Sequence, residues 1–374
     1  MKALIGTFAF VSLLVWACSK TADPSAFDTF DRKGMLTNLG NNVIISSFDV
    51  FYQKSDALEA ATIAYTADVK NEQKLIAVQK AWLDMSIAWK QASVFKQGPI
   101  EDKFLLSNID FSTKGVYLNT TLLEKAITDG TTIDNAYIES KGSTVKGIHA
   151  IEYLIFDKAQ SNATVIGGYT GINGAKRTAY LSALTTNLKN QAKIIVDAWK
   201  GGYATTFINA DGRDINSSLG ILSNKLIDLI YTIRDERIGA PKGNRNNGVP
   251  QPDLAESAIS NNSITLAINE LKGLENAFLG RTPAGIDGIG LDDLLDKLGA
   301  KSGTDLLSTK IKNQFATVYA KLNAIPAPLQ TAVVSNTVEV QAAYDEIKRL
   351  QVMLEVDMIN NLGVLLTFSD NDGD

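Results

Sequence analysis

Residues 75–92, LIAVQKAWLDMSIAWKQA, carry the repeating pattern that sets the class of this protein. Their apolar side chains recur at alternating steps of three and four, at Leu75, Val78, Trp82, Met85, Trp89 and Ala92. On an α-helix this spacing gathers the side chains into one stripe along one face. The stretch therefore predicts an amphipathic helix whose tryptophans and methionine pack in a protein core rather than bind a cofactor.

The same spacing recurs along the chain, whereas strand-like alternation is almost absent. Further stripes are Leu181, Leu184, Leu188, Ala192, Ile195 and Trp199; Leu219, Leu222, Leu226, Leu229 and Ile233; Ile264, Ala267, Leu271, Leu274 and Phe278; Leu307, Ile311, Phe315, Val318, Leu322 and Ile325; and Ile347, Leu350, Leu354 and Met358. With a helix over about residues 35–65 and a short helix around His149, the sequence predicts an all-α protein with eight main helices.

Two breaks divide these helices into two sets of four. Gly201-Gly202 and the turn at residues 211–214 fall between the fourth and the fifth helix. The chain of 374 residues is also longer than one hydrophobic core usually supports. The sequence therefore predicts two four-helix bundles, at residues 35–205 and 206–374.

The first residues are typical of a targeting segment. Lys2 precedes an apolar run over residues 3–16 that is too short to span a bilayer as a helix. Residues 14–18, LVWAC, resemble the lipobox of a bacterial lipoprotein, which predicts a signal peptide over residues 1–17 and acylation of Cys18. Residues 18–34 would then tether the protein to a membrane in the cell envelope, at the periplasmic face or the surface of the outer membrane. A plain secretory signal, which would leave a free thiol, is the alternative.

Composition and motifs exclude several functional classes. Without residues 1–17 the chain has 35 basic and 41 acidic side chains, a net charge of −6 that does not favour nucleic-acid binding. His149 is the only histidine, so zinc sites with two or three histidines are impossible. Neither a Gly-x-Ser-x-Gly elbow nor a nucleotide-binding fingerprint occurs. Residues 370–374 are too short for a calcium loop and predict a solvated acidic tail.

The one histidine is followed three residues later by a carboxylate, in residues 146–152, KGIHAIE. On a helix this spacing places His149 and Glu152 on the same face. An imidazole beside a carboxylate can ligate a metal ion or act as an oriented base. An ordinary hydrogen-bonded structural pair is the alternative.

Three stretches interrupt the helical pattern. Residues 97–102 end a helix, residues 165–174 contain four glycines, and residues 239–253 contain three prolines and three glycines before the polar segment 256–263. Long polar loops in a compact helical protein are typically functional or mobile. Ser263 is expected to cap the helix that follows.

A metal site would combine His149 and Glu152 with carboxylates from these interrupting stretches. Glu101, Asp102 and Glu256 are the best placed of them. One imidazole with several carboxylates suits iron, zinc or manganese, and the sequence does not distinguish among these metals.

Four ordered motifs carry a resemblance to a known family. They are residues 147–156, GIHAIEYLIF; Ala81-Trp82 and Ala88-Trp89 leading to Phe95 and Gly98-Pro99; Glu256-Ser257 with Ser260 and Ser263; and Leu362-Gly363-Val364 followed by Phe368-Ser369-Asp370. The first matches the Gly-x-His-x-x-Glu signature of the imelysin family, and the chain is similar to that family from about residue 35 to its end.

The resemblance implies two related helical bundles, as a duplication would produce, with the Gly-x-His-x-x-Glu helix near their interface. It also implies a link to iron uptake, because the periplasmic component of a bacterial ferrous-iron transporter carries a similar domain; the family also has a peptidase label. The motif residues expected around a pocket are Gly147, Tyr153, Ser257, Ser260 and Ser263. Relatives often carry a glutamate where this chain has Ser93, so either one carboxylate ligand is missing or Glu101 takes its role.

These observations favour an envelope-anchored protein that binds a divalent or trivalent metal, iron in preference to zinc. His149 and Glu152 would hold the metal with help from Glu101 and Glu256, and the protein would act with iron-transport components. One alternative is a metallopeptidase in which Glu256 serves as the base. The other is a protein that binds a different small molecule or a partner, with the His149 and Glu152 pair fixing helix packing.

Overall fold

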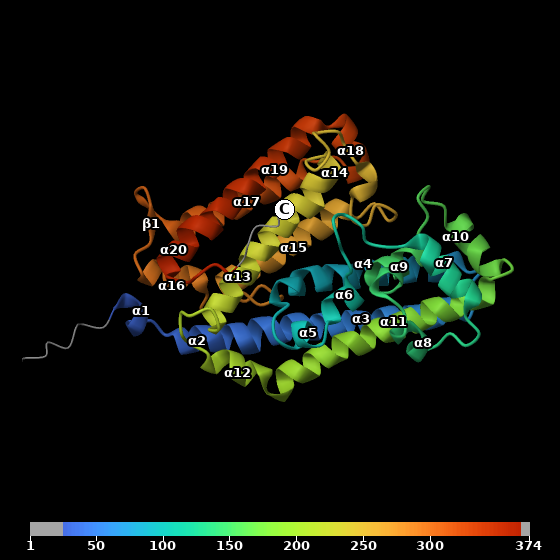
Figure 1. The fold of residues 1–374 in the computed structure, drawn as a ribbon, viewed down its shortest axis with the longest axis horizontal. Helices are drawn as coiled ribbons and strands as arrows, with labels where there is room; N and C mark the ends of the chain where they lie inside the picture. The colour runs from blue at the N-terminus through green and yellow to red at the C-terminus, as the bar shows by residue number, and fades with distance from the viewer. Residues whose placement is uncertain (1–24, 368–374) are drawn as a thin grey trace, which may run out of the picture.

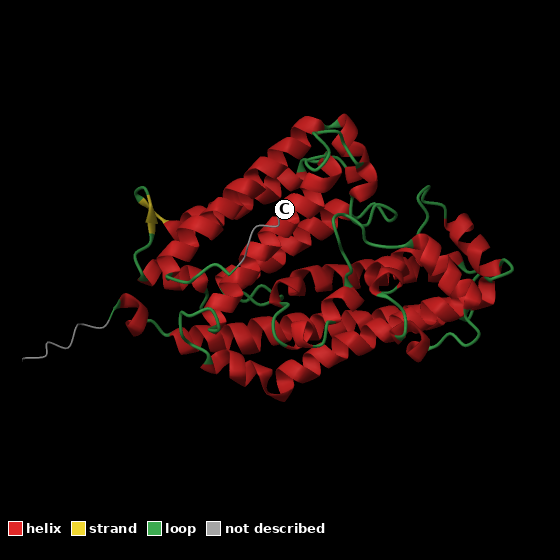
Figure 2. Cartoon of the chain, in the orientation of Figure 1, coloured by secondary structure: helices red, strands yellow, loops and turns green. Residues whose placement is uncertain are grey.

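The computed structural model describes residues 25–367, which form helices joined by loops (Figures 1 and 2). The predicted signal peptide, the predicted lipidation site Cys18, the first part of the predicted tether and the residues from 368 onward lie outside these residues. Within residues 25–367 no helix has both the length and the apolar character needed to cross a bilayer.

The first half of the chain supplies these elements: α1 (Ala26–Thr29), α2 (Arg32–Thr37), η1 (Asn38–Ile44), α3 (Ile45–Thr66), α4 (Glu72–Ala92), η2 (Ser93–Phe95), α5 (Pro99–Asp102), α6 (Leu105–Ile109), α7 (Thr120–Asp129), α8 (Asn135–Glu139), η3 (Ser143–Val145), α9 (Gly147–Ile155), α10 (Asn162–Thr170), α11 (Gly174–Ala198), η4 (Trp199–Tyr203) and α12 (Ala204–Asn209). The labels η2 and η3 mark 3₁₀ turns, and η1 and η4 mark π-helical turns.

The second half supplies these elements: α13 (Ser218–Tyr231), η5 (Thr232–Gly239), α14 (Ala240–Lys242), η6 (Pro252–Leu254), α15 (Ser263–Leu279), α16 (Leu291–Lys297), β1 (Lys301–Ser302), β2 (Asp305–Leu306), α17 (Leu307–Asn323), α18 (Leu329–Ser335), α19 (Thr337–Val352), η7 (Met353–Met358) and α20 (Ile359–Leu362). The two strands form one small antiparallel pair, in which Lys301 lies opposite Leu306.

The long helices pack in two groups that share one core. In the first group α3 packs against α4 and α11, and α9 also packs against α4 and α11. In the second group α13 packs against α15 and α19, and α17 against α19. Helix α4 of the first group packs directly on α15 of the second, and buried apolar side chains from both groups form one continuous cluster. The division at residue 205, which falls inside α12, and the origin of the two halves by duplication both stay predictions.

The all-α fold and the helical stripes are confirmed. Leu75, Trp82 and Trp89 have no exposed surface, and the members of all six stripes are buried except Ile264, which is half-buried. Helix α4 begins where the Asn71 side chain accepts a hydrogen bond from the Lys74 N–H, and it ends at Ala92. Burial of each large apolar side chain stabilises the fold by roughly 1.5–3 kcal/mol, so these stripes hold the helices together.

All three expected interruptions are partly helical. In the first of them, Pro99–Asp102 form the short helix α5. Residues 162–170 form α10, because the Ser161 side chain caps it and Val165 and Tyr169, one turn apart, are buried against the core. Tertiary burial of these two side chains outweighs the low helix propensity of the glycines between them. Likewise, residues 239–242 continue the helix η5 into α14 before the chain turns at Gly243.

Gly273 permits a close backbone approach between the two halves. A Cβ atom at this position of α15 would lie 2.3 Å from the backbone oxygen of Gln91 in α4, a distance that real side chains do not adopt. The two helices therefore touch through backbone at this crossing, one residue from Lys90 and one helical turn from Glu270. This crossing positions the charged residues described below.

Replacement of Gly273 by alanine tests the importance of the crossing. We expect Gly273→Ala to lower the free energy of unfolding by about 1–3 kcal/mol, because the methyl group forces α4 and α15 apart, although alanine has the higher helix propensity. Gly167→Ala is the control, since nothing lies within 4 Å of a Cβ atom at that helical position. Urea unfolding monitored by circular dichroism measures both; a Gly273→Ala protein as stable as the Gly167→Ala protein would contradict the expectation.

Candidate functional site

Gly147 brings a carboxylate to the histidine of the signature. It has φ of 76°, and a Cβ atom there would lie 2.4 Å from the backbone oxygen of Ile109. Only glycine allows the end of α6 to come this close to the start of α9, and the residue after Ile109 is Asp110. On the other side, the Trp82 indole donates a hydrogen bond of 3.0 Å to the backbone oxygen of Ile148. The start of α9 is therefore held between α4 and α6.

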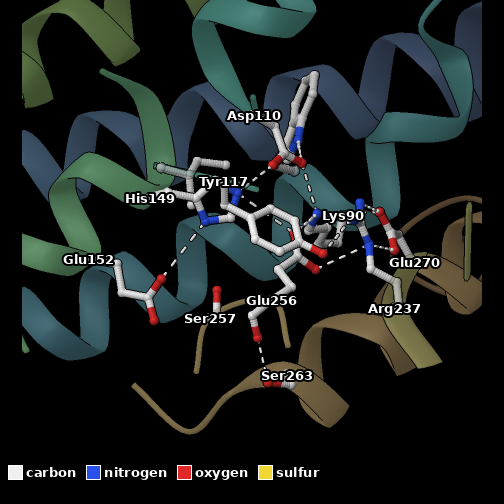
Figure 3. Close-up of polar contacts among 12 residues, drawn as sticks. Lys90, Asp110, Tyr117, His149, Glu152, Arg237, Glu256, Ser257, Ser263 and Glu270 are labelled. Carbon is white, nitrogen blue, oxygen red and sulfur yellow. Dashed lines mark hydrogen bonds and ion pairs between the residues drawn. The ribbon is translucent and has the colours of Figure 1, made fainter. Parts of the chain in front are cut away.

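His149 is buried and oriented by Asp110. Its Nε2 lies 2.9 Å from Asp110 Oδ1 (Figure 3), and its ring packs on the Tyr117 ring with centroids 4.9 Å apart. The other oxygen of Asp110 accepts hydrogen bonds of 2.8 Å each from Trp89 Nε1 and Lys90 Nζ. Asp110 thus connects the imidazole to two consecutive residues of α4.

Lys90 connects the two halves through a buried ammonium group. Its side chain has no exposed surface, and Nζ also lies 2.6 Å from Glu256 Oε1 and 3.3 Å from Glu270 Oε1. Arg237 donates two hydrogen bonds of 2.8 Å to Glu270, and its Nε lies 3.2 Å from Glu256 Oε2. We call the seven buried residues Lys90, Asp110, His149, Glu152, Arg237, Glu256 and Glu270 the buried charge cluster (Figure 3).

The Nδ1 side of His149 faces Glu152 without a hydrogen bond. Nδ1 lies 3.8 Å from Glu152 Oε2, and no hydrogen-bond partner for Nδ1 occurs among residues 25–367. The other oxygen of Glu152 accepts a hydrogen bond of 2.9 Å from the backbone N–H of Ser260. Imidazole Nδ1 and a carboxylate oxygen repel each other as acceptors unless a cation lies between them. A proton or a metal ion can be that cation.

The electrostatics of the cluster favour a charged imidazole. Burial alone would lower the pKa of His149, but the hydrogen bond with Asp110, the adjacent Glu152 and the charge of Glu256 raise it to about 9. Burial would raise the pKa of Asp110, but the Lys90 ammonium and then His149 hold it well below its usual range. Asp110 is therefore an ionised acceptor, and in the metal-free protein at neutral pH His149 carries its second proton.

The structure brings some of the predicted site residues together and separates others. Glu256 joins His149, with Oε1 3.7 Å from Nε2. Glu101 is half exposed, forms an ion pair with Lys225 and takes no part in the buried charge cluster. Ser93 is buried, but its hydroxyl donates to the backbone oxygen of Lys90 at 2.9 Å. Tyr153 is half-buried, and its hydroxyl donates to Glu124 rather than to a member of the cluster.

The serines of residues 256–263 shape the loop below the cluster. Ser260 bonds Glu152 through its backbone, and the Ser257 hydroxyl is buried without a hydrogen-bond partner among the described residues. Ser263 does not cap α15 as expected. Asn262 precedes this helix, while the Ser263 hydroxyl donates to the backbone oxygen of Glu256 and fixes that carboxylate's segment.

Four members of the cluster escaped prediction from the sequence: Lys90, Asp110, Arg237 and Glu270. Two of them left a recognisable pattern. Glu270 lies three residues after Ala267 and directly before Leu271 on the apolar stripe of its helix, and Lys90 follows the buried Trp89. A charged residue within a buried stripe indicates a buried ion pair. Asp110 and Arg237 lie in irregular or π-helical segments, where no periodicity marks them.

The fold and the cluster define an all-helical protein whose two halves meet around a buried histidine and carboxylate centre. The chain belongs to the imelysin family, whose sequence model matches residues 44–354. Iron-regulated protein A of Synechococcus elongatus is 23% identical to this chain over 305 residues, which cover 79% of this chain and 76% of the relative.

Two solved structures share the fold. A crystal structure from Parabacteroides distasonis, described as an iron-regulated protein A precursor, superimposes with a TM-score of 0.73 at 17% identity and covers 88% of this chain and 95% of its own. An imelysin-like protein from Psychrobacter arcticum gives a TM-score of 0.71 at 19% identity, with coverages of 90% and 97%. At such low identity these likenesses establish the all-helical architecture and not the chemistry of the site.

The buried ammonium provides the first test of the cluster. We expect Lys90→Met to lower the free energy of unfolding by about 3–5 kcal/mol, because Asp110, Glu256 and Glu270 lose their shared cation. Lys80→Met is the matched control: its side chain is 73% exposed and pairs with Asp84 at the surface. That change should stay within about 0.5 kcal/mol. Chemical denaturation measures both variants, and equal stability would show that Lys90 is not essential to the cluster.

The titration of His149 provides the second test. Its pKa is raised in the folded state, so the stabilisation from its second proton is complete below the unfolded pKa near 6.5 and is lost as pH rises through about 9. We expect unfolding of the protein in EDTA to become easier over this interval by on the order of 3 kcal/mol, and His149→Gln to abolish the dependence. Because the chain has one histidine, its single imidazole NMR resonance reports the pKa directly. A midpoint near 6.5 would contradict this account.

Proposed function

We propose that this protein binds a divalent or trivalent metal ion, iron in preference to zinc, at the Nδ1 side of His149. In this proposal it is anchored in the cell envelope by an acylated Cys18, serves iron acquisition or homeostasis, and passes metal to iron-transport components.

The separation of His149 Nδ1 and Glu152 Oε2 carries the proposal. The ionised Asp110 accepts the hydrogen of Nε2, so a neutral His149 presents its lone pair at Nδ1, 3.8 Å from a carboxylate oxygen. This separation is too long for a hydrogen bond and near the spacing of two ligands that each lie about 2.0–2.2 Å from one metal ion. Asp110 is then the outer carboxylate that fixes the tautomer of a metal-binding histidine.

The other side of the imidazole is less suited to a metal. Ligand atoms of Asp110, His149 and Glu256 do lie within 4.8 Å of one another. However, Lys90 Nζ lies 2.8 Å from Asp110 and 2.6 Å from Glu256, so an ammonium already neutralises these two carboxylates. Among residues 25–367, Glu152 has no such cation apart from His149 itself. Glu152 is therefore the carboxylate that a metal ion would bind, and the buried Ser257 hydroxyl offers a further oxygen donor on the adjacent loop.

The choice of iron and of the cell envelope rests on three further observations. The name of the Synechococcus elongatus relative, iron-regulated protein A, supports an iron-related role. One imidazole with carboxylate and hydroxyl oxygens is a donor set that suits iron and also zinc. The lipobox-like residues 14–18 support anchoring by a lipid.

Metal binding can be measured on single-site variants. We expect Glu152→Gln and His149→Ala to weaken Fe²⁺ binding at least tenfold, and Asp110→Asn to weaken it about 10–100-fold through loss of the orienting carboxylate. Glu101→Gln is the matched control, because it removes a carboxylate outside the cluster. Anaerobic titration calorimetry with Fe²⁺, repeated with Fe³⁺ citrate and Zn²⁺, gives the affinities and the metal preference. Equal binding by the wild type and Glu152→Gln, or a loss caused by Glu101→Gln alone, would refute the site.

A further inference from the structure

A separate cavity of about 720 Å³ lies between residues 93–114 of the first half and η5 and α15 of the second. Asp110, Arg237 and Glu270 form part of its wall, whereas His149 and Glu152 do not line it. The cavity therefore borders the buried charge cluster without containing the proposed metal ligands. Its volume is that of a typical small-molecule site.

One side of this cavity is apolar. Ile100, Leu106 and Leu229 line it together with the aromatic rings of Phe104 and Phe111. Phe104 is 79% exposed and has φ of 53°, a conformation that bulky residues rarely adopt. An aromatic side chain held in solvent at the edge of a cavity supplies apolar surface that a bound molecule would cover.

One basic side chain of the wall stays unpaired once existing pairs are considered. Lys96 pairs with Asp228, Glu101 with Lys225, and Glu236 with Arg245 at 2.5 Å. Lys114 lines the cavity and forms no ion pair within residues 25–367. Its ammonium is therefore available to a ligand in the cavity.

Arg237 adds a buried donor at the inner end. It is 5% exposed, and Nε and Nη2 bind Glu270. Among the described residues, Nη1 makes only a long contact of 3.4 Å with the Tyr117 hydroxyl. A guanidinium nitrogen with unused hydrogens in a buried wall favours an anionic oxygen. The two buried carboxylates that also border the cavity, Asp110 and Glu270, are already bonded by Lys90 and by Arg237 itself.

We propose that this cavity binds a small organic carboxylate with an apolar body. Arg237 Nη1 and Lys114 Nζ bind the carboxylate, and Phe104 and Phe111 pack against the body. Because His149 and Glu152 do not line the cavity, binding requires no metal ion and is independent of the proposed metal site.

Three probes with the same apolar body test the charge preference. They are 3-phenylpropionate, 3-phenylpropan-1-ol and 3-phenylpropylamine. Each is titrated by calorimetry into the full-length protein in EDTA. We expect the carboxylate to bind about tenfold or more tightly than the alcohol, and the amine to bind weakest, because a charge-assisted hydrogen bond adds to the same apolar contact. Equal binding of carboxylate and alcohol, tighter binding of the amine, or no binding of any probe at millimolar concentration would overturn the proposal.

Variants at exposed positions locate the site without disturbing the fold. Lys114→Gln and Phe104→Ala should each weaken 3-phenylpropionate binding about five- to tenfold, while the melting temperature stays that of the wild type. Lys158→Gln and Ile172→Ala are matched controls, since these exposed residues lie outside the cavity, and they should leave binding unchanged. An equal loss with Lys158→Gln would indicate unspecific attraction and overturn the assignment, as would full binding by Lys114→Gln.

Discussion

The buried ammonium of Lys90 is the interaction on which the arrangement of the site depends. Its removal from water costs several kcal/mol unless carboxylates surround it at hydrogen-bond distance. Those carboxylates come from three separate segments: Asp110 after α6, Glu256 in the loop before α15, and Glu270 within α15. The ammonium of Lys90 in α4 is thus paired only when both halves of the chain are in place. The backbone contact at Gly273 brings α15 close enough to α4 for these pairs to form.

The geometry of His149 follows from the same constraint. Asp110 has two oxygens, and Lys90 and Trp89 both bind Oδ2, so Oδ1 remains for the imidazole. Gly147 then allows the backbone of α6 to come near α9, and in this arrangement Nε2 faces Asp110. The signature residues Gly147, His149 and Glu152 therefore have distinct tasks. Gly147 lets the segment that carries Asp110 come close, and Asp110 orients the ring of His149. Glu152 faces the imidazole nitrogen Nδ1, which has no hydrogen bond among the described residues.

The sequence predicted those features that depend on local periodicity. The stripes of α4, α11 and α15 follow from spacing alone, and so does the common face of His149 and Glu152 on α9. The residues that complete the site could not be found in this way, because Asp110 reaches His149 across 39 positions and Lys90 reaches Glu256 across 166. Local reasoning also failed where burial overrode composition, as in the glycine-containing α10. Glu101 was a plausible ligand because it follows the end of a helix, but it forms an ion pair with Lys225 of α13 instead.

Charge balance connects Lys90 to the valence of the proposed metal. The cluster contains four carboxylates, of Asp110, Glu152, Glu256 and Glu270, against the two permanent cations of Lys90 and Arg237, which leaves a charge of −2 when His149 is neutral. A protonated His149 reduces this charge to −1, whereas a divalent ion beside a neutral His149 reduces it to zero. Unbalanced charge is costly in a buried site, so the cluster as built matches a divalent ion better than a trivalent one, which would leave a charge of +1. Lys90 thus neutralises carboxylates on the Nε2 side of His149 and leaves the Nδ1 side as the position for the proposed divalent cation.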